Sequence, residues 1–247
     1  TTWTGSVVQD AQGLWHLFYT GTSRADDGLK QRIGHATSTD LHAWVRVGDG
    51  LCLDLSGDLY EEYAPGRWHD RAMRDPWVMR DPAGGGWLMF FTGRVAGVEE
   101  ANAAGAIGLA ISPDLYRWTL QPPVFSGSFG QLEVPQVLHI GGRWVCLFCT
   151  DAAHWSRATA EAAGPPVTGT HYLVAQDPRG PWQVAAGPFL DPTPERGRYA
   201  ARIVQTLTGP VLLGFVMQGP QGFRGVVDDP VPVRVAAGGR LSLAPRG

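Results

Sequence analysis

The chain repeats one pattern of apolar runs and turns, and this repeat limits its possible folds more than any other feature. Residues 34–41 (GHATSTDL) have a close counterpart in residues 108–115 (GLAISPDL), and a tryptophan, Trp44 or Trp118, follows each segment. Each segment is also preceded by two runs of β-branched and aromatic residues with a turn between them, which is typical of a β-hairpin. Such a repeat predicts one supersecondary unit that is used several times.

Four copies of this unit can be traced, at residues 3–50, 74–121, 133–186 and 199–245. Each copy holds four short apolar runs in the order of a meander. Four-stranded antiparallel sheets repeated around an axis are the blades of a β-propeller. A β-sandwich is the alternative, but it lacks this echo within the chain. We therefore predict an all-β chain that forms a single β-propeller domain with four recognisable blades.

The composition suits short strands and argues against two classes of partner. The 247 residues include 33 glycines and 19 prolines, which favour tight turns over helices. The formal net charge of -3 supplies no basic patch for phosphates, so we expect no nucleic-acid partner. No window approaches about 18 uninterrupted apolar residues, so we expect no membrane span.

The cysteines Cys52, Cys146 and Cys149 are odd in number and provide no disulfide framework. We expect free thiols, which favours a reducing compartment such as the cytoplasm. No His, Asp or Glu cluster has metal-ligand spacing and no glycine-rich phosphate loop follows a strand, so we expect neither a metal nor another cofactor. The sequence opens at Thr1 without a methionine, and we expect it to be cut from a longer chain.

The starts of the innermost strands carry the residues most suited to chemistry. In a propeller the first strand of each blade lines the central channel, so these starts gather at one mouth. They are predicted at residues 5–6, 74–75, 132–133 and 199–200, and two of them bring carboxylates, Asp75 and Glu133. We expect both at the same depth in neighbouring blades. Glycoside hydrolysis needs such a pair, because one carboxyl group protonates the leaving oxygen while another attacks or stabilises the transition state.

Other side chains are predicted to contact a substrate at this mouth. They are Arg74, Trp3, Ser6, Trp68, His69, Gln131 and Tyr199. Loop packing is the alternative for Trp68 and His69, and core packing is the alternative for Trp3. His16 and His35 lie inside predicted strands among aromatic residues, and we expect them to be structural.

Three ordered motifs, Trp-Thr-Gly-Ser at residues 3–6, Arg-Asp-Pro at 74–76 and Glu-Val-Pro at 133–135, resemble those of glycoside hydrolase family 32. That family includes invertases, levanases and other β-fructofuranosidases, and it is related to families 43 and 68. The resemblance implies a five-bladed propeller and a retaining mechanism on furanosidic linkages, above all β-fructofuranosides. It implies that Asp75 stabilises the transition state, that Glu133 is the general acid/base, and that Trp3 forms a wall of the sugar site. Arg74 would then keep Asp75 ionised.

The sequence departs from the family pattern in two respects. Val134 stands where the family's glutamate motif usually has a cysteine. The family's nucleophile is an aspartate on a first blade upstream of the Trp-Thr-Gly-Ser motif, and only four units are recognisable here. We therefore expect the nucleophile to lie outside this sequence, because Asp10, Asp26, Asp27 and Asp70 fall in turns and loops.

Two alternatives remain open at this point. One is an inverting hydrolase of the arabinofuranosidase type, in which the two carboxyl groups would stand about 6.5 to 9.5 Å apart to admit a water molecule. The other is a propeller that binds sugar without cleaving it. In each case the expected partner is a small-molecule or oligosaccharide ligand.

Overall fold

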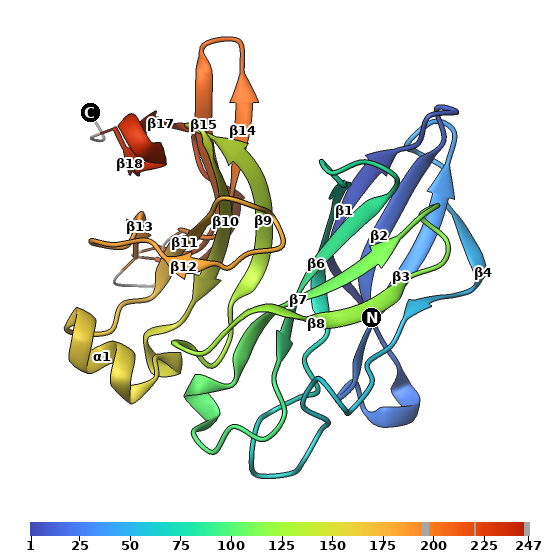
Figure 1. Cartoon of the computed structure of the whole chain (residues 1–247), viewed down its shortest axis with the longest axis horizontal. Coiled ribbons are helices and arrows are strands. Elements are labelled where there is room, and N and C mark those ends of the chain that lie inside the picture. The colour runs from blue at the N-terminus through green and yellow to red at the C-terminus, as the bar shows by residue number, and fades with distance from the viewer. Residues whose placement is uncertain (194–197, 220, 245–247) are drawn as a thin grey trace. The chain divides into compact units, whose positions relative to one another are not determined.

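A computed structural model of the chain describes residues 1–193, 198–219 and 221–244. These residues form mostly β-strands, which are grouped in four antiparallel sheets (Figure 1). By the contacts between Cα atoms the chain divides into two compact units, Thr1–Pro135 and Gln136–Gly247. Residue 245, the expected end of the fourth repeat, lies outside the described residues.

The first unit contains two four-stranded meanders, in which strands consecutive in sequence are neighbours. The first sheet consists of β1 (Thr2–Gln9), β2 (Trp15–Thr22), β3 (Gln31–Ser38) and β4 (Val45–Leu53). The second consists of β5 (Arg74–Arg80), β6 (Trp87–Arg94), β7 (Gly105–Ser112) and β8 (Thr119–Ser126). The loops carry two 3-10 helices, η1 (Arg24–Asp26) and η2 (Ala101–Ala103).

The second unit contains the other two sheets, although β9 (Glu133–Ile140) begins in the last residues of the first unit. The third sheet runs in the order β12-β11-β10-β9, with β13 also paired to β11. Its further strands are β10 (Arg143–Thr150), β11 (Gly169–Ala175), β12 (Gln183–Val184) and β13 (Asp191–Pro192). Between β10 and β11 lie η3 (Ala152–His154) and the short helix α1 (Arg157–Ala163).

The fourth sheet runs in the order β14-β15-β17-β18, and β16 also pairs with β15. Its strands are β14 (Arg198–Thr206), β15 (Gly209–Gly219), β16 (Gly222–Val227), β17 (Val231–Val235) and β18 (Leu241–Leu243), with η4 (Ala237–Gly239) before the last. The prediction of an all-β propeller with four blades in this chain is confirmed by these four sheets. Within the described ranges no helix is both long and apolar enough to cross a membrane.

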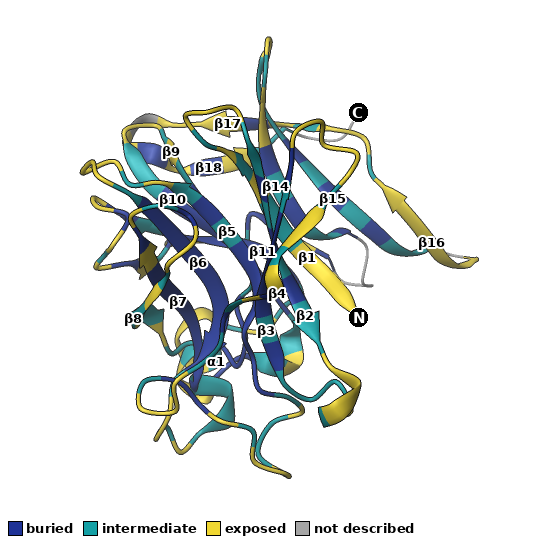
Figure 2. Ribbon diagram, turned by 90° about the vertical axis from the view of Figure 1, so that its right-hand side faces the viewer, coloured by how far each residue is buried: buried dark blue, intermediate teal, exposed yellow. Residues whose placement is uncertain are grey.

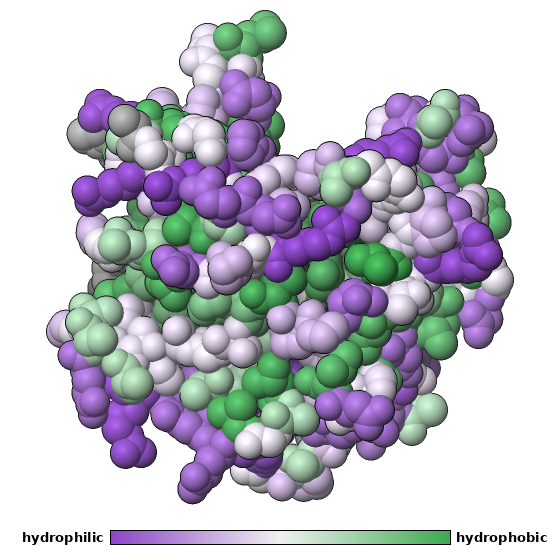
Figure 3. All heavy atoms as spheres, in the orientation of Figure 1, coloured by the Kyte–Doolittle hydropathy of each residue, from purple (hydrophilic) through white to green (hydrophobic). Residues whose placement is uncertain are grey.

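Each unit has its own hydrophobic core. In the first unit all eight residues of β6 are buried, so this strand reads as an almost continuous apolar run, and Figure 2 shows it in dark blue. Phe18, Met73 and Phe91 belong to that core, and Leu147 and Leu212 belong to the core of the second unit. On the face drawn in Figure 3, hydrophobic and hydrophilic residues are interspersed, as is usual for protein surfaces.

The cysteines are free thiols in the structure. Cys146 and Cys149 on β10 are buried and Cys52 on β4 is half-buried. Burial raises the pKa of the Cys52 and Cys146 thiols to about 12, so both are protonated and unreactive near neutral pH.

Three first strands, β1, β5 and β14, share one irregularity close to their starts. The pairing of β5 with β6 skips from Arg74 to Trp77, so that β5 carries one residue more than its partner strand, which is a β-bulge. The pairing of β1 with β2 skips in the same way from Thr2 to Gly5, and that of β14 with β15 from Tyr199 to Arg202.

This irregularity corrects the predicted alignment of the repeats. The backbone is left-handed at Asp75 (φ 58°), at Val134 (φ 52°) and at Ala200 (φ 51°), which makes these residues equivalent. Glu133 therefore corresponds to Arg74 and not to Asp75. The expectation that Asp75 and Glu133 occupy equivalent positions is wrong by one residue, because the bulge and not the first apolar residue sets the register.

Candidate active site

The site is built around Arg74, the first residue of β5, whose side chain is only 4% exposed. Its Nη2 atom donates to Glu133 Oε1 at 2.9 Å and to Gln131 Oε1 at 3.1 Å, and its Nη1 atom donates to Gln31 Oε1 at 3.2 Å. Burial alone would lower the pKa of this guanidinium, but the negative charges of Glu133 and the nearby aspartates raise it. Arg74 is therefore a permanent cation.

Glu133 is the most exposed of the three carboxylates that surround Arg74. Its side chain is 21% exposed, against 12% for Asp70 and 5% for Asp75. Glu133 Oε1 accepts the hydrogen bond from Arg74, and Glu133 Oε2 accepts one from Gln131 Nε2 at 2.9 Å. Glu133 is thus both fixed by the protein and open to solvent.

Asp75 is held by donors from three other strands. Its Oδ2 atom accepts from Thr92 Oγ1 on β6 and from the Val134 backbone N on β9, both at 3.0 Å, and its Oδ1 atom accepts from Thr4 Oγ1 on β1. Asp75 Oδ2 also lies 3.7 Å from Arg74 Nε. Val134 directly follows Glu133 in the chain, so its bond to Asp75 joins Asp75 to the start of β9. Asp75 and Glu133 therefore belong to one network.

Two residues on the far side of Arg74 extend this network. Gln31, the first residue of β3, donates from Nε2 to Asp70 Oδ2 at 2.6 Å, and Asp70 Oδ2 lies 3.7 Å from Arg74 Nη1. Sequence reasoning missed Gln31 and Thr92, and it dismissed Asp70 as a loop residue. A polar residue that ends or begins an apolar strand was the available signal, but the strand pairing that brings it to Arg74 cannot be seen in the sequence.

The loop that precedes β5 brings two further predicted residues to this region. His69 is exposed, with its Nε2 atom 3.5 Å from Asp70 Oδ2. Trp68 instead covers the buried Arg94, whose guanidinium carbon lies 3.7 Å from the centre of the indole ring. Arg94 in turn donates to Glu61 Oε1 at 2.7 Å, so Trp68 packs on a buried ion pair.

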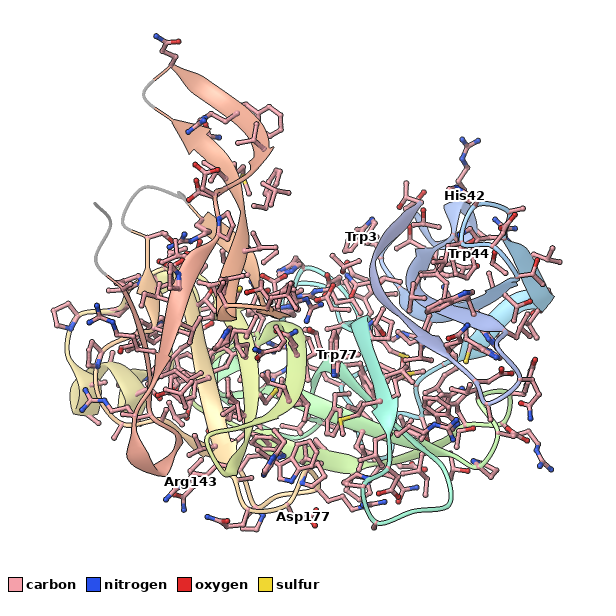
Figure 4. The ribbon with its side chains drawn as sticks, turned by 90° about the horizontal axis from the view of Figure 1, so that it is seen from above. Trp3, His42, Trp44, Trp77, Arg143 and Asp177 are labelled. Atoms are coloured by element: carbon pink, nitrogen blue, oxygen red, sulfur yellow. The ribbon has the colours of Figure 1, made fainter. Side chains whose placement is uncertain are left out.

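The remaining predicted residues have different surroundings. Ser6 Oγ on β1 accepts from the Val78 backbone N at 3.0 Å and thereby joins β1 to β5. Trp3 is 49% exposed, and its Nε1 atom donates to Thr1 Oγ1; Figure 4 shows it on β1. Tyr199 lies in the second unit, at the bulge of β14.

The chemistry open to this site is proton transfer at a carboxyl group. Glu133 can exchange a proton with a ligand or with water, while Arg74 compensates the charge of its ionised form. The described part of the chain holds no group of three or more His, Cys, Asp or Glu side chains that could bind a metal ion.

Comparisons with solved structures agree with this fold. Inulosucrase from Halalkalicoccus jeotgali bound to kestose has a TM-score of 0.78 at 20% identity, over 98% of this chain and 69% of that one. Levansucrase from Gluconacetobacter diazotrophicus has a TM-score of 0.72 at 20% identity, over 98% and 62% of the two chains. Full-length β-fructofuranosidase from Microbacterium saccharophilum K-1 has a TM-score of 0.73 at 17% identity, over 99% and 58%. At these identities the likeness shows the fold alone, and the chain spans about three fifths to two thirds of these proteins.

Comparison of the sequence itself gives the family. No curated protein sequence matches the chain. The family description "Glycosyl hydrolases family 32 N-terminal domain" matches residues 1–176, which is more than half of the 247 residues and includes all three motifs. The resemblance that these motifs indicated is confirmed. The chain belongs to glycosyl hydrolase family 32, of which it carries the N-terminal domain.

Proposed function

We infer that the chain is the propeller of a glycoside hydrolase that cleaves β-fructofuranosides, with Glu133 as its general acid/base. The observation that carries this proposal is a solvent-reachable carboxylate held 2.9 Å from a buried arginine, in a chain of family 32. The similar structures support the choice of substrate, since they are those of an inulosucrase bound to kestose, a levansucrase and a β-fructofuranosidase.

Glu133 would transfer one proton in each half of the reaction. In the first half its carboxyl group gives the proton to the glycosidic oxygen, the bond from that oxygen to the anomeric carbon breaks with its electron pair passing to the oxygen, and an attacking carboxylate bonds to the anomeric carbon. In the second half water displaces that carboxylate from the anomeric carbon, and the Glu133 carboxylate takes a proton from the water. Arg74 compensates the negative charge that Glu133 carries between the two halves.

Asp75 would stabilise the transition state and would not attack the sugar. Among the described residues its Oδ2 atom accepts two hydrogen bonds, whereas Oδ1 accepts one, from Thr4, which leaves one lone pair of Oδ1 for a further donor. A hydroxyl group of the fructosyl ring can donate to that lone pair, and such a bond strengthens as positive charge develops on the ring. Double displacement also needs an attacking carboxylate, a role that we assign neither to Asp75 nor to Asp70, because protein groups hold both.

The proposal is tested with the full-length protein and Glu133→Gln. Sucrose, inulin and levan serve as substrates with poor leaving groups, and p-nitrophenyl β-D-fructofuranoside serves as the activated substrate. We expect Glu133→Gln to lower kcat/KM on sucrose by about 10² to 10⁴, and to lower it far less on the activated substrate, which needs no acid. The matched control is Glu161→Gln, because Glu161 is an exposed residue of α1, and this variant should behave as wild type.

Other outcomes distinguish the alternatives. An equal loss on both kinds of substrate would contradict the role of Glu133 as the acid. Hydrolysis of an arabinofuranoside but not of fructosides would favour the arabinofuranosidase alternative. Calorimetric binding of fructo-oligosaccharides without any turnover would identify a sugar-binding propeller. For an active enzyme, the anomer first released, followed by NMR before mutarotation, separates retention from inversion.

A further inference from the structure

The side chain of Gln131 connects the two central groups of the site. Its Oε1 atom accepts from Arg74 Nη2 at 3.1 Å, and its Nε2 atom donates to Glu133 Oε2 at 2.9 Å. Arg74 Nη2 also donates to Glu133 Oε1, so the three side chains form a closed triangle of hydrogen bonds. Gln131 is only 7% exposed, and Arg74 and Glu133 bind the two ends of its amide group.

The chemistry of its neighbours fixes the orientation of this amide. A guanidinium group only donates hydrogen bonds, and an ionised carboxylate only accepts them. The oxygen of Gln131 must therefore face Arg74 and its nitrogen must face Glu133. Another hydrogen-bonded carboxylate in this place would repel Glu133, and a lysine would repel Arg74, so the position calls for a neutral group that both accepts and donates.

Arg74 is itself fixed from its other side. Gln31 Oε1 accepts from Arg74 Nη1 at 3.2 Å and also from the Met73 backbone N at 3.2 Å. The guanidinium is thus anchored to the backbone just before β5 through Gln31. Because Gln131 binds both Arg74 and Glu133, it fixes the orientation of the Glu133 carboxyl group relative to the guanidinium.

The geometry points to Gln131 as a positioning residue for the proton of Glu133, rather than a contact with the substrate. Oε1 of Glu133 remains bound to Arg74, so the transferred proton is carried by Oε2. The N–H group of Gln131 donates to Oε2 and cannot accept a hydrogen bond, so a proton on Oε2 is directed away from Gln131. The inference rests on the proposed role of Glu133 as general acid/base.

Gln131→Met tests the inference, because methionine has a similar length but no amide. The matched control is Gln121→Met on β8, where the wild-type side chain donates to the carbonyl oxygens of Thr119 and Leu120. With the full-length protein we expect Gln131→Met to lower kcat on sucrose by about 10- to 100-fold and to change KM less than about twofold. On p-nitrophenyl β-D-fructofuranoside the loss should stay below about threefold. Gln121→Met should match wild type on both substrates.

A crystal structure of Gln131→Met supplies a readout that does not depend on turnover. We expect the Glu133 side chain to leave the position that it has in wild type, because the hydrogen bond from Gln131 to its Oε2 atom is gone. An unmoved Glu133 with unchanged kcat on sucrose would overturn the inference, and so would a raised KM with equal losses on both substrates, which indicates a substrate contact. If wild type cleaves no fructoside but Glu133 moves in the variant, the proposed function fails while the positioning role stands.

Discussion

The starts of β5 and β14 have the same backbone but different side chains. Both strands bulge near their first residue, and the left-handed residue is Asp75 in one and Ala200 in the other. The bulge of β14 forms without any carboxylate at this position. The fold therefore does not require Asp75, and its charge, together with that of Glu133 at the start of β9, serves another purpose.

Each of these strands also begins with a buried arginine. Arg198 is bound by Asp191 through two hydrogen bonds of 2.6 and 2.8 Å, in which both carboxylate oxygens take part. Arg74 instead makes single bonds to Gln31, Gln131 and Glu133. The closed, bidentate pair leaves the Asp191 side chain only 9% exposed, and Arg198 makes one further, longer bond of 3.3 Å to the more exposed Asp228. The divided bonds of Arg74 instead leave Glu133, one of its main partners, 21% exposed. The bidentate pair suits stability, and the divided bonds suit chemistry.

Replacing each arginine by methionine should have the largest effect on stability and should show the difference between the two arginines. Arg198→Met leaves Asp191 buried without its cation, and we expect a loss of about 3 to 5 kcal/mol in the free energy of unfolding. Arg74→Met should cost less, about 2 to 3 kcal/mol, because Gln131 still binds Glu133, while Thr92 and Val134 still bind Asp75. Chemical denaturation at neutral pH measures both values.

The matched control is Arg117→Met, since Arg117 forms an exposed ion pair with Asp114 and should contribute less than about 1 kcal/mol. Measuring the turnover of fructosides by the two variants distinguishes the roles of the two arginines further. Arg74→Met should abolish turnover of fructosides in protein that is still folded, whereas Arg198→Met should lower stability and leave kcat of the folded fraction unchanged. A greater loss of stability for Arg74→Met than for Arg198→Met would contradict the distinction between closed and divided networks.

The sequence predicts the sheets better than it predicts the site. The hairpin signals and the echo between residues 34–41 and 108–115 were sufficient for four antiparallel sheets, because each of these sheets is built from strands close in the sequence. The motifs also pointed to Arg74 and Glu133. Gln31 lies 43 residues before Arg74, however, and no local pattern marks so distant a partner.

The alignment of the repeats failed for a related reason. Apolar runs place a strand to within a residue or two, but a bulge shifts every later side chain by one position. Val134 is β-branched, a type that rarely adopts positive φ, so nothing in the sequence suggested that it is the counterpart of Asp75. The structure supplies the reason for this conformation, since the Val134 backbone N donates to Asp75 Oδ2.

A second comparison concerns one buried histidine in each unit. Burial, together with the charge of His16, lowers the pKa of His35 to about 4, and burial lowers that of His171 to about 4 against the opposing effect of its bond to the Ala185 carbonyl oxygen. The unfolded chain has a histidine pKa of about 6.5, so it binds more protons than the folded chain between these values. The free energy of unfolding should therefore fall as the pH drops from about 6.5 to about 4, by up to about 3 kcal/mol for each histidine.

Denaturation at pH 7 and at pH 4.5 measures this pH dependence, and variants of the two histidines show how much of it each unit contributes. His171 accepts from the Leu190 backbone N at Nδ1, where a second proton has no place, so His171→Phe should remove about half of the pH dependence. His35→Phe should remove the other half. The ring of His35 lies 2.9 Å, Nε2 to Nδ1, from that of His16, which approaches Asp10 at 3.3 Å. An unchanged slope in both variants would show that other groups dominate acid unfolding.

The smallest expected effect tests the backbone itself. An alanine in the left-handed region costs about 1 to 2 kcal/mol, whereas glycine adopts it freely but loses about 0.5 to 1 kcal/mol more through chain entropy. Ala200→Gly should therefore stabilise the protein by about 0.5 kcal/mol. Asp75→Gly is a substitution at the equivalent position but should destabilise the protein, because Thr4 and the Val134 backbone N lose the acceptor that Asp75 provides. Opposite signs in denaturation of the two variants would show that the bulge is shared and the carboxylate is an addition to it, and a loss of stability in both would refute that view.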